Sequence, residues 1–463
     1  MMFFKRFLLK MFKKKYPSNL FLDSDMTVSY MNDESGKNGE QPLGVFFPEN
    51  SEDVKKMASF CYRYKIPYIV RGKGTGKTGG AVPVKKSLII VMERMNRIII
   101  DTKNLTAEVE PGAITLDIQK AAAEENLFYP VDPASLDSCS IGGNIAENAG
   151  GPRAFKYGVT RDFVLGLDVV LPNGDFIRLG GKTRKDVSGY NLKDIFIGSE
   201  GTLGTVTKAY LKLLPLPKEK ILVWAVFDDF FEAVEAMSAV YQTSLTPSCI
   251  EFIEGRAFQA VEKMLHKPIP DADSQAHLLI EVDGFEKDGV LKQGKALSEV
   301  LYRFSPKRIS VLPYHRQQEK IWNLRRQISE ATKHASFDKK SEDICVPPAN
   351  LKAFLEAMRE IEKVSGVDII CFGHLGDGNV HVNILNIKDE TGITWKKFSK
   401  KIVYSVFDTA IKLGGTLSGE HGIGLTKKKY FSAFTDPEII MIHKKLKKLF
   451  DPKKLLNPKK IWK

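Results

Sequence analysis

The chain has 463 residues, too many for a single hydrophobic core, so we expect two or three domains. Hydrophobic residues make up 43% and charged residues 27% of the sequence, a balance typical of folded globular proteins and not of disordered chains. The net charge of +13 is compatible with nucleic acid, an anionic membrane or no specific partner. Because the lysines are spread widely and no nucleic-acid-binding motif occurs, we expect no nucleic-acid partner.

The first predicted element is a basic amphipathic helix within residues 1–20. Its apolar side chains recur at helical spacing and lysines surround them; the apolar positions are Phe4, Phe7, Leu8, Met11 and Phe12. The apolar run is too short to span a bilayer, and no small-residue cleavage site of a secretory signal follows. Two interpretations stay open: a helix in the interface of an anionic membrane, and a helix packed on its own domain. We expect a cytoplasmic protein, free or on the inner face of the membrane.

A glycine-rich turn, residues 71–80, follows a short apolar strand predicted at residues 67–70. Successive glycines expose backbone N–H groups, and such a nest holds phosphate oxygens. The spacing does not fit a Walker A loop, which would need glycine at Arg71, or GxGxxG, whose third glycine is replaced by Lys77. The alternative is a flexible turn without a ligand.

Two more glycine-rich segments, residues 140–151 and 198–207, lie next to predicted strands. Small residues and amides at this density allow a planar ring to lie against the backbone, with Ser140 and Asn144 available for its polar edge. Between the two segments, residues 168–178 are predicted to form a strand, a turn at Asn173 and Gly174, and a second strand. Three such turns in one region indicate a shared ligand.

The second half of the chain has a different pattern. Strands are predicted at residues 221–227, 277–282 and 367–371, and amphipathic helices at 231–241 and 351–364, which indicates an antiparallel sheet covered by helices. Two glycine-padded turns, residues 373–381 and 418–424, hold three of the eight histidines. This clustering predicts a small polar reaction centre. The five cysteines form no CxxC pair, which argues against an iron–sulfur cluster or a disulfide framework.

The ordered motifs resemble the flavin-binding domain of the vanillyl-alcohol oxidase superfamily, of the p-cresol methylhydroxylase (PCMH) type. They are RGxGTG, Asp132-Pro133-Ala134-Ser135, SIGGNIAENAGG, YG, LPNG and GSEGTLG. GHLGDGNVH and GEHGIG further resemble the FAD-linked D-2-hydroxyacid dehydrogenases: D-lactate dehydrogenase, the glycolate oxidase flavoprotein subunit and D-2-hydroxyglutarate dehydrogenase. The resemblance covers the chain from about residue 40 onward.

The resemblance implies an α+β fold, with a PCMH-type FAD-binding domain of two α/β subdomains and a cap domain of antiparallel sheet with covering helices. We expect four parts: the N-terminal helix, 1–20; the FAD-binding domain, 38–217; the substrate or cap domain, 218–411; and a C-terminal segment, 412–463, that packs back on the FAD-binding domain.

The resemblance also implies FAD. Relatives that attach FAD covalently have histidine where Thr75 stands, so we expect FAD to be bound non-covalently. The residues expected to contact it are Arg71, Gly72, Lys73, Gly74, Thr75, Gly76, Gly79, Gly80, Pro133, Ser140, Gly143, Asn144, Asn148, Gly151, Gly204 and Val206.

The two histidine-bearing turns supply candidates for the chemistry. His374, His381 and Glu420 offer two imidazoles and one carboxylate, which suit zinc or another first-row divalent metal. His421 is the candidate catalytic base. The alternative is that the histidines form hydrogen bonds inside their turns and bind no metal.

Substrate-binding residues are also implied. Arg325 ends a segment that resembles the W-x-L-R helix of the family, and it would bind the substrate carboxylate with Ser329, one turn later. Asn383 lies two residues after His381 and so on the same side of a strand. Lys340 is assigned to the carboxylate pocket, although the sequence around it departs from the family pattern by one residue.

We therefore expect FAD-dependent, metal-assisted oxidation of a small D-2-hydroxy acid, such as D-lactate or glycolate, to the 2-oxo acid. Hydride would pass from C2 to flavin N5, and the electrons would go to a quinone, a cytochrome or an electron-transfer protein. Two alternatives remain: a non-redox, FAD-dependent synthase of ether-lipid type, and a basic scaffold that binds nucleic acid.

Overall fold

The computed structural model describes residues 2–387 and 392–462. Residues 1, 388–391 and 463, which fall within the predicted ranges 1–20, 218–411 and 412–463, lie outside the described part. The chain forms two compact units: unit 1 consists of Met1–Gly150, Val159–Leu216 and Glu420–Lys463, and unit 2 of Gly151–Gly158 and Pro217–Gly419. The short segment Gly151–Gly158 thus belongs to a different unit from its neighbours on both sides.

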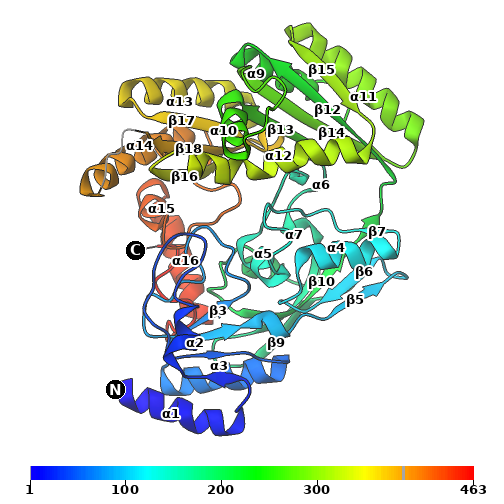
Figure 1. Cartoon of the computed structure of the whole chain (residues 1–463). Helices are drawn as coiled ribbons and strands as arrows, with labels where there is room; N and C mark the ends of the chain where they lie inside the picture. The colour runs from blue at the N-terminus through cyan, green and yellow to red at the C-terminus, as the bar shows by residue number, and fades with distance from the viewer. Residues whose placement is uncertain (1, 388–391, 463) are drawn as a thin grey trace. The chain divides into compact units, whose positions relative to one another are not determined.

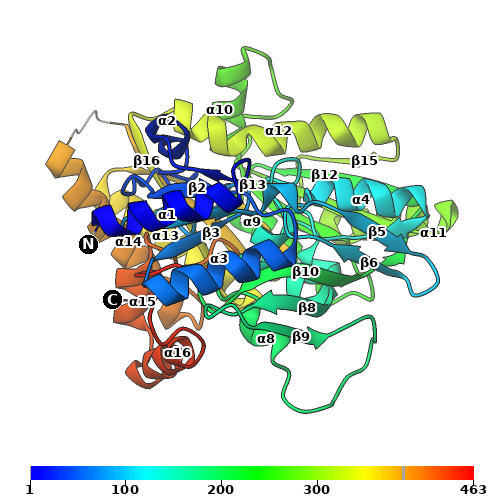
Figure 2. The same ribbon diagram turned by 90° about the horizontal axis from the view of Figure 1, so that it is seen from below.

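Unit 1 begins with a four-stranded sheet of order β1-β2-β4-β3. Strands β2, β4 and β3 are parallel, and β1 is antiparallel to β2. The elements are α1 (Met2–Lys15), β1 (Leu20–Phe21), α2 (Ser24–Val28), β2 (Gly44–Phe46), α3 (Ser51–Tyr64), β3 (Tyr68–Arg71) and β4 (Leu88–Val91). Helices α1 and α3 lie side by side on one face of this sheet, where Leu9, Met57 and Phe46 share a buried core (Figure 2). Helix α3 starts where the side chain of Asn50 accepts a hydrogen bond from the backbone N of Asp53.

The second sheet of unit 1 is five-stranded and antiparallel, with order β5-β6-β10-β8-β9. Its strands are β5 (Ile98–Asp101), β6 (Thr106–Val109), β8 (Val164–Val170), β9 (Phe176–Gly180) and β10 (Thr205–Lys212). Strands β8 and β9 form the hairpin predicted around Asn173 and Gly174. Figure 2 shows the loop from β9 to α8 (Lys193–Phe196) extending away from this sheet.

The remaining helices and strands complete unit 1. They are η1 (Met92–Arg94), α4 (Thr115–Glu124), β7 (Leu127–Phe128), α5 (Ile141–Glu147), α7 (Thr160–Phe163), β11 (Leu214–Pro215), α15 (Lys428–Phe434) and α16 (Pro437–Phe450). Strands β7 and β11 pair with each other. Tyr68 of β3 accepts a backbone hydrogen bond from Asn457, so the last residues of the chain are built into unit 1 beside the first sheet.

Unit 2 is built on one seven-stranded antiparallel sheet of order β15-β12-β14-β13-β17-β18-β16. The strands are β12 (Glu219–Phe227), β13 (Cys249–Glu254), β14 (Ala276–Gly284), β15 (Arg308–Leu312), β16 (Asp338–Cys345), β17 (Asp368–Gly373) and β18 (Asn379–Asn386). The helices are α6 (Ala154–Tyr157), α9 (Phe230–Val240), α10 (Gly255–Leu265), α11 (Lys287–Leu301), η2 (Tyr302–Phe304), α12 (His315–His334), η3 (Pro348–Asn350), α13 (Leu351–Ser365), η4 (Leu375–Asp377) and α14 (Gly392–Lys412).

Side chains along each strand point alternately to the two faces of this sheet, and helices cover both faces. Leu222 and Trp224 of β12 and Phe372 of β17 point to the face that α10 and α12 cover, and they share a core with Trp322 of α12. Helix α11 packs on the opposite face, where Gly294 approaches Ile221 of β12 (Figure 1). An α+β fold with a helix-covered antiparallel sheet, as predicted, is confirmed.

Candidate functional site

The first histidine-bearing turn joins β17 to β18. His374 follows β17, the 3-10 turn Leu375–Asp377 comes next, and Gly378 has a φ of 83°, a left-handed conformation that favours glycine. A side chain at Gly378 would also collide with the carbonyl oxygen of Val346. The turn returns the chain so that His381 on β18 faces His374, with their ring centroids 5.3 Å apart.

Glu251 on β13 orients His374. Its carboxylate is fully buried and is hydrogen-bonded both to Nδ1 of His374 and, at 2.6 Å, to Nε of Arg325. Burial raises the pKa of this carboxyl group, but the charges of Arg325 and His374 outweigh burial and bring the pKa to about 2. An ionised Glu251 keeps the imidazole proton on Nδ1, which makes Nε2 the nitrogen with a lone pair for a metal.

The second histidine-bearing turn supplies Glu420. Asp343 on β16 accepts a hydrogen bond at 3.1 Å from the backbone N of Gly419, the residue before Glu420. The ligand atoms of His374, His381 and Glu420 all lie within 4.8 Å of one another. The three residues predicted as metal ligands are therefore close enough to share one ion.

The donor chemistry of this cluster fits a first-row divalent ion. Two imidazoles and one carboxylate are three protein ligands, the number in catalytic zinc sites that keep a position for water or substrate. Ligands at ~2.0 Å from a tetrahedral ion are about 3.3 Å apart, so atoms within 4.8 Å need only small side-chain shifts. The carboxylate of Glu251 behind His374 is also the partner that metal-bound histidines usually have.

His421, the predicted base, directly follows the cluster. Its Nε2 lies 3.6 Å from Oε1 of Glu420, and its side chain is 27% exposed. Within unit 1 its backbone carbonyl accepts a hydrogen bond at 3.1 Å from Oγ1 of Thr78, in the first glycine-rich turn. The main chain at His421 is thus fixed, and the partly exposed ring is accessible for proton exchange.

Three of the four predicted substrate-binding residues, all but Lys340, lie on the α12 side of the sheet of unit 2. Arg325 reaches Glu251 from α12, and its guanidinium carbon lies 4.9 Å from the centroid of the Phe372 ring. Ser329 is exposed one turn further along the helix. Asn383 is fully buried, and its Oδ1 accepts a hydrogen bond at 2.9 Å from Ser341, so this amide is held rigidly.

Strand β16 places Lys340 on the other face. Ser341 pairs with Asn383 in the register, so Lys339 shares their face and Lys340 does not. Nζ of Lys339 donates hydrogen bonds to the carbonyl oxygen of Ser329 at 2.8 Å and to Oγ1 of Thr332 at 3.0 Å, whereas Lys340 pairs with Asp338 at 2.8 Å. The geometry thus favours Lys339 over the predicted Lys340 as the lysine near Arg325 and Ser329.

Two residues of the site were missed by the sequence analysis. Glu251 lies in the strand Cys249–Glu254, and the other side chains on its face of this strand are apolar. A single acidic residue among inward-facing apolar ones could have indicated a functional role. Asp343 accepts from Asn379 at 2.6 Å as well as from Gly419. Its role depends on three segments far apart in the sequence, and no local pattern indicates it.

Unit 1 contains all but one of the residues predicted to hold FAD. Oγ of Ser140 is buried and has no hydrogen-bond partner among the described residues. A Cβ on Gly72 would collide with this oxygen, and a Cβ on Gly143 would lie 3.7 Å from it. This buried hydroxyl lies beside the backbones of two glycines, which leave space around it. Such a site fits a polar ligand, such as the cofactor, that would form the missing hydrogen bond.

The other predicted cofactor residues take several positions around these turns. Arg71 is buried and donates to the carbonyl oxygen of Asn32 at 2.7 Å, so it supports its own loop. Lys73 pairs with Glu93 at 3.2 Å. Asn144 is buried within α5, and Gly151 belongs to unit 2. The others lie in loops, at a helix end or at a strand end of unit 1; they are Gly74, Thr75, Gly76, Gly79, Gly80, Pro133, Asn148, Gly204 and Val206.

Glu200 joins the third glycine-rich turn to the last part of the chain. It is buried and accepts backbone hydrogen bonds from Ile423 at 2.8 Å and Gly424 at 2.7 Å. Thr78 of the first turn accepts from the backbone N of Leu425 at 2.7 Å. Residues of two glycine-rich turns therefore fix the segment that follows His421.

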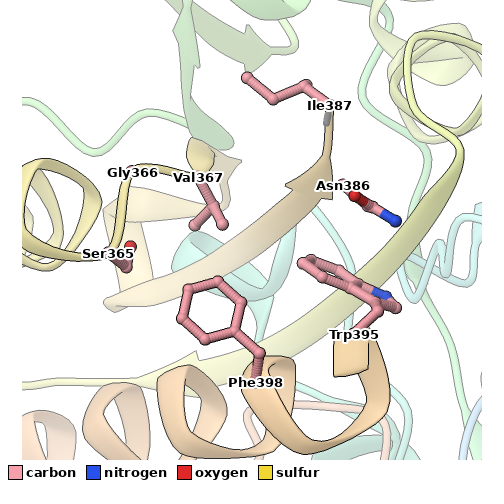
Figure 3. Close-up of a pocket in the computed structure, with 7 residues that line it drawn as sticks. All are labelled: Ser365, Gly366, Val367, Asn386, Ile387, Trp395 and Phe398. Atoms are coloured by element: carbon pink, nitrogen blue, oxygen red, sulfur yellow. The ribbon is translucent and has the colours of Figure 1, made fainter. Parts of the chain in front are cut away.

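A small cavity in unit 2 lies at the opposite ends of β17 and β18 from the histidines. Figure 3 shows Trp395 and Phe398 of α14 pointing toward Asn386 and Val367. Nε1 of Trp395 donates to Asp338 at 2.7 Å. The cavity contains none of the predicted site residues, and we assign it to packing.

Comparison with known proteins gives matches over most of the chain. Residues 42–180 match the FAD binding domain family, and residues 216–461 match the family of FAD linked oxidases, C-terminal domain. The glycolate oxidase subunit GlcD of Bacillus subtilis (strain 168) is 37% identical over 460 residues, covering 96% of this chain and 94% of that protein. The D-lactate dehydrogenase of Archaeoglobus fulgidus is 34% identical over 419 residues, covering 90% of each. A crystal structure of p-cresol methylhydroxylase with substrate bound shares the fold, with a TM-score of 0.81 at 19% identity over 99% of this chain and 96% of that chain.

Proposed function

The chain belongs to the FAD-linked oxidases, and on this premise we propose that it oxidises a small D-2-hydroxy acid to the corresponding 2-oxo acid. It is an FAD-linked oxidoreductase of the family that includes glycolate oxidase subunits and D-lactate dehydrogenases. The names of these relatives support glycolate, D-lactate or an acid of similar size as the substrate.

One arrangement carries the proposal: Glu251 holds both Arg325 and His374. A 2-hydroxy acid has a carboxylate next to the carbon that bears its hydroxyl, so its site needs a cation and a hydroxyl-binding group a few ångströms apart. Arg325 would bind the carboxylate, and the cluster of His374, His381 and Glu420 would bind the hydroxyl. In this proposal one buried carboxylate would fix the distance between the two functions, because it bonds both Arg325 and His374.

Each of these residues has its own role in the proposed reaction. Bound FAD supplies the hydride acceptor, at N5 of the flavin. An ion held by His374, His381 and Glu420 would polarise the substrate hydroxyl and lower its pKa. His421 takes the hydroxyl proton; the C2–H electron pair leaves as hydride, and the C2–O single bond becomes the carbonyl of the product. Asn383 would fix a substrate oxygen, with Ser329 and Lys339 beside the carboxylate.

FAD would be held without a covalent bond, because Thr75 offers no nucleophile of the histidine kind at that position. The cradle around Ser140 would supply polar contacts for it. A quinone, a cytochrome or an electron-transfer protein would then reoxidise the flavin.

Anaerobic reduction of the purified flavoprotein tests the function. We expect D-2-hydroxy acids to bleach the flavin absorbance in stopped flow, and their L-enantiomers to do so far more slowly. Removing the metal with a chelator, or replacing His421→Ala, should slow the reductive step by about 100-fold or more, in line with the loss of a general base. His334→Ala, an exposed histidine on α12, is the matched control. A flavin that every 2-hydroxy acid leaves oxidised would refute the proposal and favour the synthase alternative.

A further inference from the structure

Helix α1 has two apolar faces, only one of which is used inside the protein. Leu9 is fully buried, and the ring of Phe12 packs against Phe60 at 4.7 Å and Phe46 at 6.2 Å between centroids. Nζ of Lys5 donates to the carbonyl oxygen of Lys65 at 2.7 Å. These contacts fix the helix on α3 and the first sheet, so its orientation on unit 1 is set.

The second apolar face points to solvent. Phe4 is 60% exposed, Phe7 58% and Met11 50%. Their spacing of three and four residues puts them in one stripe along the helix, turned away from the stripe that holds Leu9 and Phe12. Three large apolar side chains aligned on the outside of an already packed helix are not needed for folding.

The positive charge of the helix indicates an anionic partner. Met2–Lys15 contains six basic residues and no acidic one. Lys10 and Lys14 are exposed beside the apolar stripe. Glu52 and Asp53 lie at the start of α3 close to Tyr16, beyond the end of the stripe. The exposed face thus combines apolar side chains with the positive charges of Lys10 and Lys14, which form no ion pair with a described residue.

We propose that α1 docks unit 1 on an anionic lipid bilayer, with Phe4, Phe7 and Met11 inserted at the level of the acyl chains and Lys10 and Lys14 against the phosphates. A stripe of large apolar residues flanked by lysines is the pattern of helices that lie in the membrane interface. Among the described residues, no helix is long and apolar enough to cross a bilayer, which agrees with a helix lying in its plane. The proposal does not depend on the identity of the substrate, and it places the flavoprotein where a lipid-soluble electron acceptor would be found.

Vesicle sedimentation with the FAD-loaded full chain tests this proposal. We expect the protein to pellet with vesicles of phosphatidylcholine mixed with phosphatidylglycerol, and to stay in the supernatant with phosphatidylcholine alone. Raising the salt from about 0.1 M to 1 M should release it, because the screening length falls from about 10 Å to 3 Å. A protein that stays in the supernatant with both vesicle types would overturn the proposal and leave the exposed face of α1 to a protein partner.

Paired variants separate the two components of binding. Phe4→Ser with Phe7→Ser, and separately Lys10→Glu with Lys14→Glu, should each weaken binding to anionic vesicles by more than tenfold. All four side chains are exposed, so flavin content and flavin reduction by substrate should match the wild type. The controls lie in unit 2: Phe285→Ser, at a 54% exposed phenylalanine, and Lys292→Glu with Lys295→Glu on α11. If the control variants weaken binding as much as the α1 variants do, the helix is not the docking surface.

Discussion

Nδ1 of His374 is hydrogen-bonded to the carboxylate of Glu251, on a strand 123 residues earlier in the chain. The same carboxylate accepts from Nε of Arg325 at 2.6 Å and has no solvent exposure. A proposed metal ligand and the proposed substrate-carboxylate receptor are therefore oriented by one residue. A substitution of Glu251 should therefore change both the affinity for the metal and the affinity for the substrate.

Replacing Glu251→Gln should lower zinc affinity by 10–100-fold, the usual cost of losing the hydrogen-bond partner of a metal-bound histidine. Competition with a chromogenic chelator measures this directly, without turnover. Glu254→Gln is the control, because Glu254 is a buried glutamate of the same strand that pairs with Arg256 and Arg359. It should reduce the free energy of unfolding and leave zinc affinity unchanged. Unaltered zinc affinity in Glu251→Gln would show that His374 is not held for a metal.

Arg325→Lys should raise KM for the 2-hydroxy acid at least tenfold, because a lysine cannot keep the bond to Glu251 and also bind a carboxylate with a planar fork. Arg326→Lys is the matched control one residue away. Arg326 is 51% exposed and pairs with Glu319 at 3.0 Å, so its replacement should leave KM and kcat unchanged. Steady-state kinetics of the two variants, measured side by side, decide whether the buried arginine binds substrate.

The register of β16 makes a separate prediction about two neighbouring lysines. Lys339→Met should raise KM, because Nζ of Lys339 lies by Ser329 and Thr332 on the α12 face. Lys340→Met should have little effect, because Lys340 pairs with Asp338 on the other face. If Lys340→Met raised KM and Lys339→Met did not, the strand would have to bind substrate through its opposite face.

Local patterns were enough to predict much of this fold. The glycine-padded turn that contains Gly378 needs a left-handed residue, and the hairpin of β8 and β9 follows from an Asn-Gly turn between alternating strands. The helix-covered antiparallel sheet followed from hydrophobic periodicity. These features depend on residues within one or two turns of each other, which is why one sequence sufficed.

Pairing between distant segments could not be predicted in the same way. Lys339 and Lys340 are both polar, so the sequence of β16 does not show which of them points to which face of the sheet. A shift of one residue in the predicted strand exchanges its two faces. Glu251 meets His374 only because β13 and β17 are neighbours in the sheet. The sequence of α1 likewise left two interpretations open. Buried Leu9 shows that the helix packs on its own domain, whereas exposed Phe7 belongs to the face for which membrane contact is proposed.

Lys460 gives the clearest pH-dependent contribution to stability. Its side chain is 3% exposed, and Nζ donates to the carbonyl oxygens of Gly79 and, at 2.6 Å, Val82, beside the first glycine-rich turn. Burial lowers the pKa of Lys460 from its ordinary 10.5 to about 8, while Asp33, Glu200 and Glu147 raise it in part and Lys428 lowers it further. Between these two values the unfolded chain binds more protons than the folded one.

The cost of burying the charged ammonium is therefore present in full below about pH 8 and is relieved as the pH rises toward 10.5. Lys460→Met removes this titration. The free energy of unfolding of the wild type, relative to that of Lys460→Met, should thus increase by about 2–3 kcal/mol between pH 7 and pH 10, since one pKa unit corresponds to about 1.4 kcal/mol. Urea unfolding of both proteins at several pH values measures the difference, and Lys448→Met, at an exposed lysine of the same unit, should show none. A difference that fell with rising pH would mean that Lys460 is stabilised as a cation by Glu200 and Glu147 more strongly than burial opposes it.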